Sequence, residues 1–344
     1  TVQLYSFIML NQVSIVIPTL ERPHMLERSI GSCLGQTVPP LEVLVVDNGD
    51  HPGTIEIVEK LNRNKSGIGV RRLASEKGNL SKALTLGFES AQGDWTIHLD
   101  DDDLLVPTRV ELDIELGQDL ADNDVGIVHD FVRVDYNGSL VWQHSAGDKP
   151  LGLKEALVLD HFPPPPALTW RSELLKKYHP FHTKDGRLID YIVYANLLAH
   201  GQLTKSHQCG YIQDDTRIPG RLSGLFTRSI GEIDIHRENF RELRSLVTAN
   251  EEEIDQRLDA QIAFYSGRSN GLKVFYGEAG SYARAHPIEA LKGMLSPFRA
   301  FASRYFSSIL PEVRGSRSYT LDTFAKQSPE ICHLIQNARL KTND

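Results

Sequence analysis

The first hundred residues alternate between short apolar runs and helical patterns, and this alternation constrains the fold more than any other feature. The apolar runs are VSIVIPT, LEVLVV, GIGVRRLA and DWTIHL, and helical patterns separate them at about 23–36, 53–63 and 79–91. Repeats of strand and helix at this length predict a mainly parallel sheet that helices cover on both faces. We therefore expect an α/β fold.

The second part of the chain follows a different pattern. VGIVHDFVRVDYNGSLVWQH predicts a β-hairpin that turns at Asn137-Gly138, so the sheet is expected to become mixed beyond residue 120. The prolines at 163–166 predict an extended loop before the strand ALTWR, since proline lacks the amide donor that a strand needs. A helical pattern covers about 188–200, and charged helical patterns begin after a boundary near 225–232.

Composition excludes several classes of protein. The 344 residues are 40% hydrophobic and 24% charged, which excludes a disordered chain, a collagen-like repeat and a coiled coil. A net charge of −8 disfavours nucleic acid as a partner.

Cys33, Cys209 and Cys332 have neither disulfide nor zinc spacing. The first ten residues lack the charged start of a signal peptide, and no apolar run reaches membrane-spanning length, so a cytoplasmic protein is expected.

Polar residues follow three of the predicted strands, at 19–22, 47–50 and 100–103. Open sheets of this kind bind ligands at the carboxyl ends of their strands. Four consecutive carboxylates would repel one another without a cation, and on extended chain Asp100 and Asp102 would share a face suited to Mg²⁺ or Mn²⁺. The run alone equally fits a solvated acidic turn that caps a helix starting at Pro107.

Two long segments carry a family resemblance. VSIVIPTLERPHMLERSIGSCLGQTVPPLEVLVVDNGD and KGNLSKALTLGFESAQGDWTIHLDDDDLLVP resemble the amino-terminal half of the inverting, nucleotide-sugar-dependent glycosyltransferases of family 2. ALTWRSELLKKYHPFHTKDGRLIDYIVYANLLAHG and YIQDDTRIPGRLSG extend the resemblance more weakly, to about residues 13–225. The chain departs from the family pattern at Leu84-Thr85, at Ile189 and by lacking a histidine in RIPGRLSG.

The resemblance implies a GT-A (Rossmann-like) fold, a mixed and mainly parallel sheet flanked by helices, with a helical C-terminal extension. Its expected parts are an N-terminal extension at 1–12, a GT-A glycosyltransferase domain at 13–228 and a helical C-terminal region at 229–344. Within the domain, 13–106 would bind the nucleotide sugar and 107–228 the acceptor.

The resemblance also implies roles for single residues. A nucleotide-diphosphate sugar would contact Thr19, Glu21, Asp47, Lys82, Asp100, Arg217, Arg221 and Ser223. Asp100 and Asp102 would hold Mn²⁺ or Mg²⁺, and Asp103 would support them. For Asp47 the alternative is a turn residue ahead of Gly49, and for Lys82 it is a place on a solvated helix face.

Asp190 matches the position of the family's general base, which takes a proton from the acceptor hydroxyl. The alternative is a helix N-terminal residue that interacts with the helix dipole. Three further carboxylates compete for the role of base: Asp185, Asp214 and Asp215. Three histidines without metal-ligand spacing are expected to be packed or on the surface: His98, His129 and His161.

The expected function is that of a metal-dependent inverting glycosyltransferase in polysaccharide biosynthesis. It would move a sugar from a UDP-, GDP- or dTDP-sugar to a hydroxyl of a glycan, lipid-linked or small-molecule acceptor. The alternatives are a nucleotide-sugar-binding protein without turnover and a sugar nucleotidyltransferase. Peripheral contact with the inner face of the membrane through the C-terminal helices stays open, as does a homo-oligomer, while nucleic acid is not expected as a partner.

Overall fold

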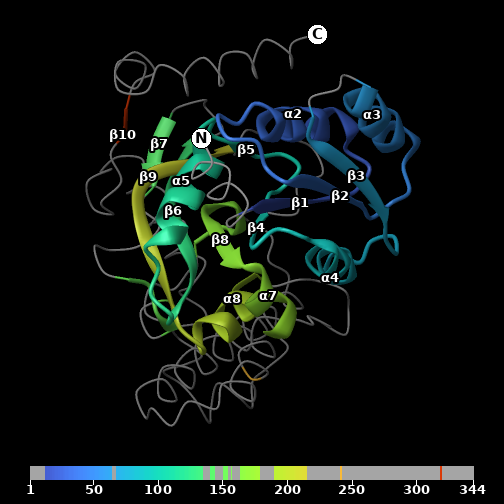
Figure 1. Ribbon diagram of the computed structural model, residues 1–344. Helices are drawn as coiled ribbons and strands as arrows, with labels where there is room; N and C mark the ends of the chain where they lie inside the picture. Colours follow the sequence, from blue (N-terminus) through green and yellow to red (C-terminus); the bar gives the residue numbers. More distant parts are fainter. Residues whose placement is uncertain are drawn as a thin grey trace, which may run out of the picture.

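The computed structural model describes residues 12–63, 67–134, 140–143, 150–153, 156, 163–178, 190–214, 241 and 318–319. The described strands form one sheet, in the order β10-β7-β6-β8-β4-β1-β2-β3, with β9 beside β6 and β5 beside β9 (Figure 1). The α/β fold with a mixed sheet that the sequence predicts is confirmed.

The strands are β1 (Val13–Thr19), β2 (Glu42–Asp47), β3 (Gly69–Ala74), β4 (Trp95–His98), β5 (Leu104–Leu105), β6 (Asp124–Val134), β7 (Leu140–Gln143), β8 (Leu168–Arg171), β9 (Gln202–Asp214) and β10 (Ser318–Tyr319). The helices are α2 (Pro23–Leu34), α3 (Pro52–Arg63), α4 (Leu80–Ser90), α5 (Arg109–Gln118), α7 (Ser172–Tyr178) and α8 (Asp190–Leu198), with a 3₁₀ turn η1 (Pro165–Ala167).

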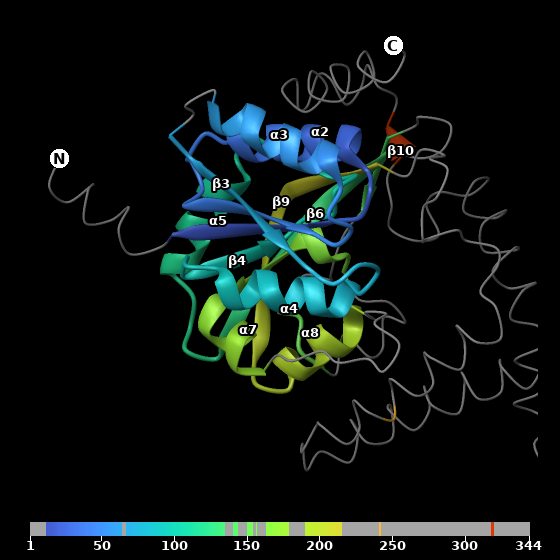
Figure 2. The same cartoon turned by 90° about the vertical axis from the view of Figure 1, so that its right-hand side faces the viewer.

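The parallel half of the sheet, β4-β1-β2-β3, has buried side chains on both faces. Alternate residues of β1 point to opposite faces, so Ile15 packs in one core cluster with Leu26 of α2 and Val16 packs in the other with Leu84 of α4. Figure 2 shows α2 and α3 on one side of these strands and α4 on the other. This arrangement leaves the carboxyl ends of β1, β2 and β4 as one continuous edge.

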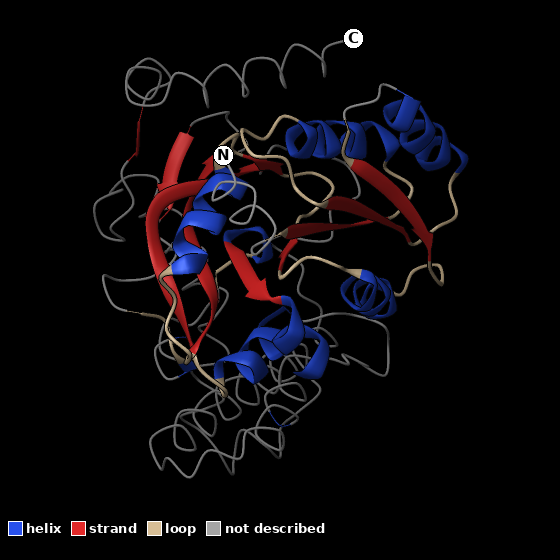
Figure 3. Cartoon of the chain, viewed as in Figure 1, coloured by secondary structure: helices blue, strands red, loops and turns tan. Residues whose placement is uncertain are grey.

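The other half of the sheet is mixed, as predicted. β8 runs antiparallel to both β4 and β6, and β7 runs antiparallel to β6. β9, which the sequence analysis missed, pairs in parallel with β6 along its length (Figure 3). Its polar stretch TKSHQ breaks the alternation by which strands are recognised, and the pairing with β6 has three register irregularities. The predicted turn at Asn137-Gly138 lies outside the described residues.

Three details of the prediction are wrong. β4 ends at His98, so the strand does not continue through the aspartates at 100–103, which form a turn in which Asp103 N donates to Asp100 O at 3.1 Å. The prolines are not extended throughout, because η1 begins at Pro165. The following helix, α5, begins at Arg109 and not at Pro107. The turn lets neighbouring carboxylates point in different directions, which extended chain would restrict to two faces.

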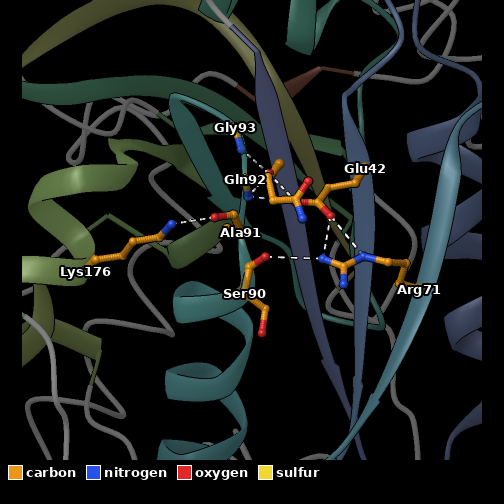
Figure 4. A network of polar contacts seen from close by, with 8 residues as sticks. Glu42, Arg71, Ser90, Ala91, Gln92, Gly93 and Lys176 are labelled. Carbon is orange, nitrogen blue, oxygen red and sulfur yellow. Dashed lines mark hydrogen bonds and ion pairs between the residues drawn. The ribbon is translucent and has the colours of Figure 1, made fainter.

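A polar cluster stabilises the connection between α4 and β4, at the end of the sheet opposite to the carboxyl ends of β1, β2 and β4 (Figure 4). Glu42 Oε2 accepts from Arg71 Nη2 at 2.8 Å, while its Oε1 accepts from Gln92 N at 2.8 Å. Arg71 Nη2 also donates to Ser90 O at 3.2 Å, and Lys176 Nζ of α7 donates to Ala91 O. The cluster thereby fixes where β4 begins, and with it the position of the aspartate turn.

A fully buried charge network joins α5, β6 and β8. Arg109 Nε pairs with Asp113 Oδ2 at 2.9 Å, and Arg109 Nη1 donates to Pro166 O at 2.6 Å. Thr169 Oγ1 accepts from Arg109 Nη2 at 2.7 Å and donates to Asp113 Oδ2 at 2.9 Å, and His129 Nε2 lies 2.7 Å from Asp113 Oδ1. Burial lowers the pKa of His129, consistent with a packed neutral imidazole, as predicted.

Replacing Thr169 with Val is expected to lower the free energy of unfolding by about 1–3 kcal/mol. The isosteric change removes one acceptor and one donor, leaving buried groups of Arg109 and Asp113 with one partner fewer. Denaturant unfolding monitored by circular dichroism measures the loss. Thr37→Val is the matched control: Thr37 Oγ1 is also hydrogen-bonded but exposed, so we expect a change below about 0.5 kcal/mol. Equal effects at both sites would contradict a stabilising role of the network.

Other predictions concern termini and thiols. Among the described helices, none has both the length and the apolarity to cross a membrane. Cys33 and Cys209 are buried free thiols, and burial raises the pKa of each to about 12. Outside the described residues lie Cys332, residues 1–11 of the N-terminal extension predicted at 1–12, and the domain boundary predicted at 228.

Candidate functional site

The ends of β1 and β2 place two predicted ligand residues side by side. Thr19 is in register with Asp47, and Val16 is in register with His98, where β4 ends. The three strands therefore reach the same edge of the sheet, as the strand-end argument predicted.

Asp47 is fully buried and its carboxylate is held from several directions. Arg72 Nε of β3 donates to Asp47 Oδ2 at 2.9 Å, and the backbone N–H groups of Gly49 and His51 donate to the carboxylate at 3.2 Å each. Arg72 also pairs with the exposed Asp50. Asp47 is thus both a turn-forming residue and an oriented carboxylate at the strand edge, and the sequence analysis missed Arg72, which orients it.

Two residues at this edge have left-handed backbone conformations, Glu21 at φ 55° and Asp50 at φ 52°. Non-glycine residues adopt this region at a cost, and such strain concentrates at functional sites. The Glu21 carboxylate is exposed and pairs with Lys77, whose hydrogen bond lowers the pKa of Glu21.

Lys82 lies in the first turn of α4. Its backbone N–H donates to Asn79 Oδ1 at 3.0 Å, which caps the helix, and its ammonium group pairs with Glu76 on the surface. The structure therefore places Lys82 near a helix start with an exposed side chain. Contact with a phosphate stays a prediction.

The aspartate turn brings three carboxylates together. Oxygen atoms of Asp100, Asp102 and Asp103 all lie within 4.8 Å of one another. No other set of three His, Cys, Asp or Glu side chains in the described part of the chain gathers in this way. Hard carboxylate oxygens at this spacing suit Mg²⁺ or Mn²⁺, so the donor set fits the metal that the sequence analysis expected. Asp103, expected to support the site, joins Asp100 and Asp102 as a candidate ligand.

Asp101 has a different environment from its neighbours. Its side chain is buried, accepting from Thr19 Oγ1 at 2.7 Å and pairing with Arg22 Nη2 at 2.6 Å. Arg22 Nη1 also lies 3.2 Å from Asp102 Oδ2. Burial raises the pKa of Asp101 to about 7, although Arg22 and Thr19 oppose the shift. Thr19 therefore supports the aspartate turn, a contact that the sequence did not reveal.

The raised pKa of Asp101 predicts a pH-dependent stability. The folded state binds the proton more tightly than the unfolded state, whose pKa is near 3.8, so this stabilisation is complete below pH 4 and is lost as pH rises towards 7. We expect the free energy of unfolding of the wild type to fall relative to Asp101→Asn by up to about 1.4 kcal/mol per pH unit between pH 5 and 7. Urea unfolding in EDTA measures both proteins, and parallel pH profiles would contradict the expectation.

Two more side chains border the aspartate turn. Asp103 Oδ1 accepts from the backbone N–H of Asp214 at 3.0 Å, and the Asp214 carboxylate pairs with Arg28 of α2 at 3.1 Å. His98 is buried, with Nε2 3.4 Å from Asp100 Oδ1. Asp214, one of the alternative candidates for the base, thus borders the aspartate turn and already has partners for its backbone N–H and its carboxylate.

The remaining predicted residues are only partly accounted for. Asp190 begins α8, as its alternative role as a helix N-terminal residue requires, while the surroundings of its side chain lie outside the described part. Tyr194 of the same helix stacks on Trp170 of β8 at 5.2 Å, and β8 pairs with β4, so α8 is anchored to the sheet through β8. The other candidates fall outside the described residues, namely Asp185, Asp215, Arg217, Arg221, Ser223 and His161.

Comparison with known proteins agrees with this geometry. The family model for glycosyl transferase family 2 matches residues 14–179, a range that includes the strand edge and the aspartate turn. This segment of the chain, just under half of its length, is similar to family 2. The match ends before Asp190 and the residues that follow it, so it does not reach the predicted base.

One relative of the chain is a much longer protein. The chondroitin synthase of Pasteurella multocida (strain Pm70) is 27% identical over 300 residues, which cover 76% of this chain and 30% of the synthase. The chain thus spans less than a third of the length of this relative.

Solved structures share the GT-A fold of the chain. TarS 1–349 of S. aureus, in complex with UDP-GlcNAc, has a TM-score of 0.58 at 19% identity, covering 96% of this chain and 92% of that one. The mannosyltransferase PcManGT of Pyrobaculum calidifontis, in complex with GDP-Man and Mn²⁺, has a TM-score of 0.53 at 14% identity, covering 89% of each chain. These likenesses establish the fold of the chain.

Proposed function

We propose that the protein is a divalent-metal-dependent, inverting glycosyltransferase that uses a nucleotide-diphosphate sugar. The observation that carries the proposal is the meeting of Asp47 and the three carboxylates of the aspartate turn at one sheet edge, in a segment that is similar to family 2. Its structural neighbours are complexes with UDP-GlcNAc and with GDP-Man and Mn²⁺, which supports a nucleotide-sugar donor here.

The residues have distinct roles in this proposal. Asp47, oriented by Arg72 and by the backbone N–H groups of Gly49 and His51, accepts a ring N–H of the donor base. Asp100, Asp102 and Asp103 would hold the divalent metal. A bound divalent metal would neutralise charge on the departing diphosphate.

The proposed transfer is a single displacement. The acceptor oxygen forms a bond to the anomeric carbon while the bond from that carbon to the diphosphate oxygen breaks. The acceptor's proton passes to the carboxylate of Asp190, the residue at the start of α8 that matches the family's base position. Attack on the face opposite the diphosphate inverts the anomeric configuration, and no covalent enzyme intermediate forms.

A donor and acceptor screen tests this proposal. The purified protein is incubated with UDP-GlcNAc or GDP-Man and with chondroitin oligosaccharides or other glycans, in Mn²⁺ or in EDTA. We expect release of a nucleoside diphosphate that requires both an acceptor and Mn²⁺, and a product of inverted configuration by NMR. Nucleotide binding without release would favour the alternative of a binding protein. Reversible formation of pyrophosphate from a sugar phosphate and a nucleoside triphosphate would identify a nucleotidyltransferase.

A further inference from the structure

Arg22 lies between two carboxylates that have different roles. Its guanidinium pairs with Asp101, which is buried and hydrogen-bonded to Thr19, and with Asp102, which belongs to the three-carboxylate group. The Arg22 side chain is 29% exposed, so solvent and small ions reach it. One cation therefore joins a structural carboxylate to a candidate metal ligand.

The backbone around Arg22 fixes the position from which its side chain extends. The preceding residue, Glu21, is in the left-handed region, and Pro23 begins α2 directly afterwards. Arg22 O accepts from Met25 N at 3.2 Å and from Leu26 N at 3.1 Å. A residue held in this way cannot move far from the aspartate turn, although its long side chain can exchange partners.

A guanidinium and a divalent cation at the same carboxylate oppose each other. In the low effective dielectric of a partly buried site, two positive charges close to each other repel far more than they do in water. Arg22 therefore lowers the affinity of the aspartate turn for a metal ion that arrives alone. A nucleoside diphosphate carries negative charge and compensates both cations, so its arrival removes the conflict.

We propose that Arg22 is an internal counter-cation that occupies Asp102 until metal and diphosphate bind together. The bond to Asp101 keeps Arg22 at the site, while the bond to Asp102 is the one that metal binding replaces. This positioning role makes metal binding depend on the donor, and it rests on the proposed function because it assigns the metal to the aspartate turn.

The test measures binding of Mn²⁺ alone to the full chain, by the electron paramagnetic resonance signal of free Mn²⁺. In the absence of nucleotide, Arg22→Gln is expected to bind Mn²⁺ about tenfold more tightly than the wild type. Addition of UDP, GDP, dTDP or CDP is expected to tighten Mn²⁺ binding strongly in the wild type. The gain in Arg22→Gln is expected to be about tenfold smaller, because this variant lacks the cation whose conflict with the metal the nucleotide relieves.

Two further variants separate this role from a general effect of charge. Arg28→Gln removes the same charge from a neighbouring residue that pairs with Asp214 and not with a proposed ligand, so its Mn²⁺ affinity should stay within about threefold of wild type. Arg22→Lys keeps the charge but not the forked contact, and an intermediate affinity is expected. It also serves as the test variant if Arg22→Gln fails to fold, as judged by a melting curve in EDTA.

The outcomes distinguish this inference from the proposed function. Equal gains in Arg22→Gln and Arg28→Gln, or no gain in either, would overturn the role of Arg22 while nucleotide-dependent Mn²⁺ binding by the wild type would leave the proposed function standing. Absence of Mn²⁺ binding in every protein, with and without nucleotides, would overturn both.

Discussion

Replacing Asp102 with Asn is expected to lower turnover about 10³-fold and to weaken Mn²⁺ binding at least about 100-fold. Asp102 is buried, and its carboxylate lies within 4.8 Å of those of Asp100 and Asp103. The amide has the same shape but lacks the charge and one hard oxygen. Replacing a residue that only hydrogen-bonds to a metal ligand already lowers metal affinity by about 10–100-fold. Replacing a ligand itself should lower the affinity at least as much.

Controls show whether the effect of Asp102→Asn is specific. Asp119→Asn changes an exposed carboxylate at the end of α5 and should leave turnover within about twofold of wild type. Melting curves in EDTA should show that Asp102→Asn is folded. Turnover of the folded Asp102→Asn protein within tenfold of wild type would exclude Asp102 as an essential metal ligand.

Replacing Asp190 with Asn is expected to lower turnover by about 10²–10⁴-fold, the usual contribution of a positioned general base. Asp190 begins α8, a helix anchored through the stacking of Tyr194 on Trp170. Asp190 is neither a proposed metal ligand nor a proposed nucleotide contact, so binding of Mn²⁺ and nucleoside diphosphate should remain within about twofold of wild type. Parallel kinetics and calorimetry separate this pattern from that of Asp102→Asn, which loses both.

The rival base provides the comparison for Asp190. Asp214 pairs with Arg28 through its side chain and contacts Asp103 only through its backbone N–H, so Asp214→Asn should lower stability while Mn²⁺ affinity and turnover stay within a few fold of wild type. If Asp190→Asn retains turnover within a few fold while Asp214→Asn loses it, the assignment of the base to Asp190 is wrong.

The fold was predictable where periodicity is strong. The apolar runs of β1 and β2 are buried on both faces, and their residues alternate between two core clusters, so the sequence pattern matches the packing directly. β9 and α7 were missed because TKSHQ interrupts the strand pattern and SELLKKY is a short helix that directly follows a strand. The placement of β9 depends on long-range pairing with β6 and that of α7 on packing against α4 and β8, and no local pattern encodes either.

The candidate site was predictable as a set of strand ends but not as a set of contacts. The positions of Asp47, Asp100 and Asp102 followed from the order of strands and the family resemblance. The inward turn of Asp101 and its bond to Arg22 did not, because adjacent aspartates have the same local pattern and only the fold distinguishes them. One signal was available for Arg72, a charged residue inside an otherwise strand-like run next to the Asp47 strand.

The most direct test of the proposed donor and metal site is thermal stabilisation of the wild type by UDP, GDP, dTDP and CDP, each with and without Mn²⁺, alongside Asp102→Asn. A ligand at 100 times its Kd stabilises the native state by about 2.7 kcal/mol, which raises the melting temperature measurably. We predict a rise with one diphosphate that requires Mn²⁺ and is absent in Asp102→Asn. No rise with any diphosphate, or an equal rise without Mn²⁺ and in Asp102→Asn, would contradict a metal-assisted nucleotide-sugar site at the aspartate turn.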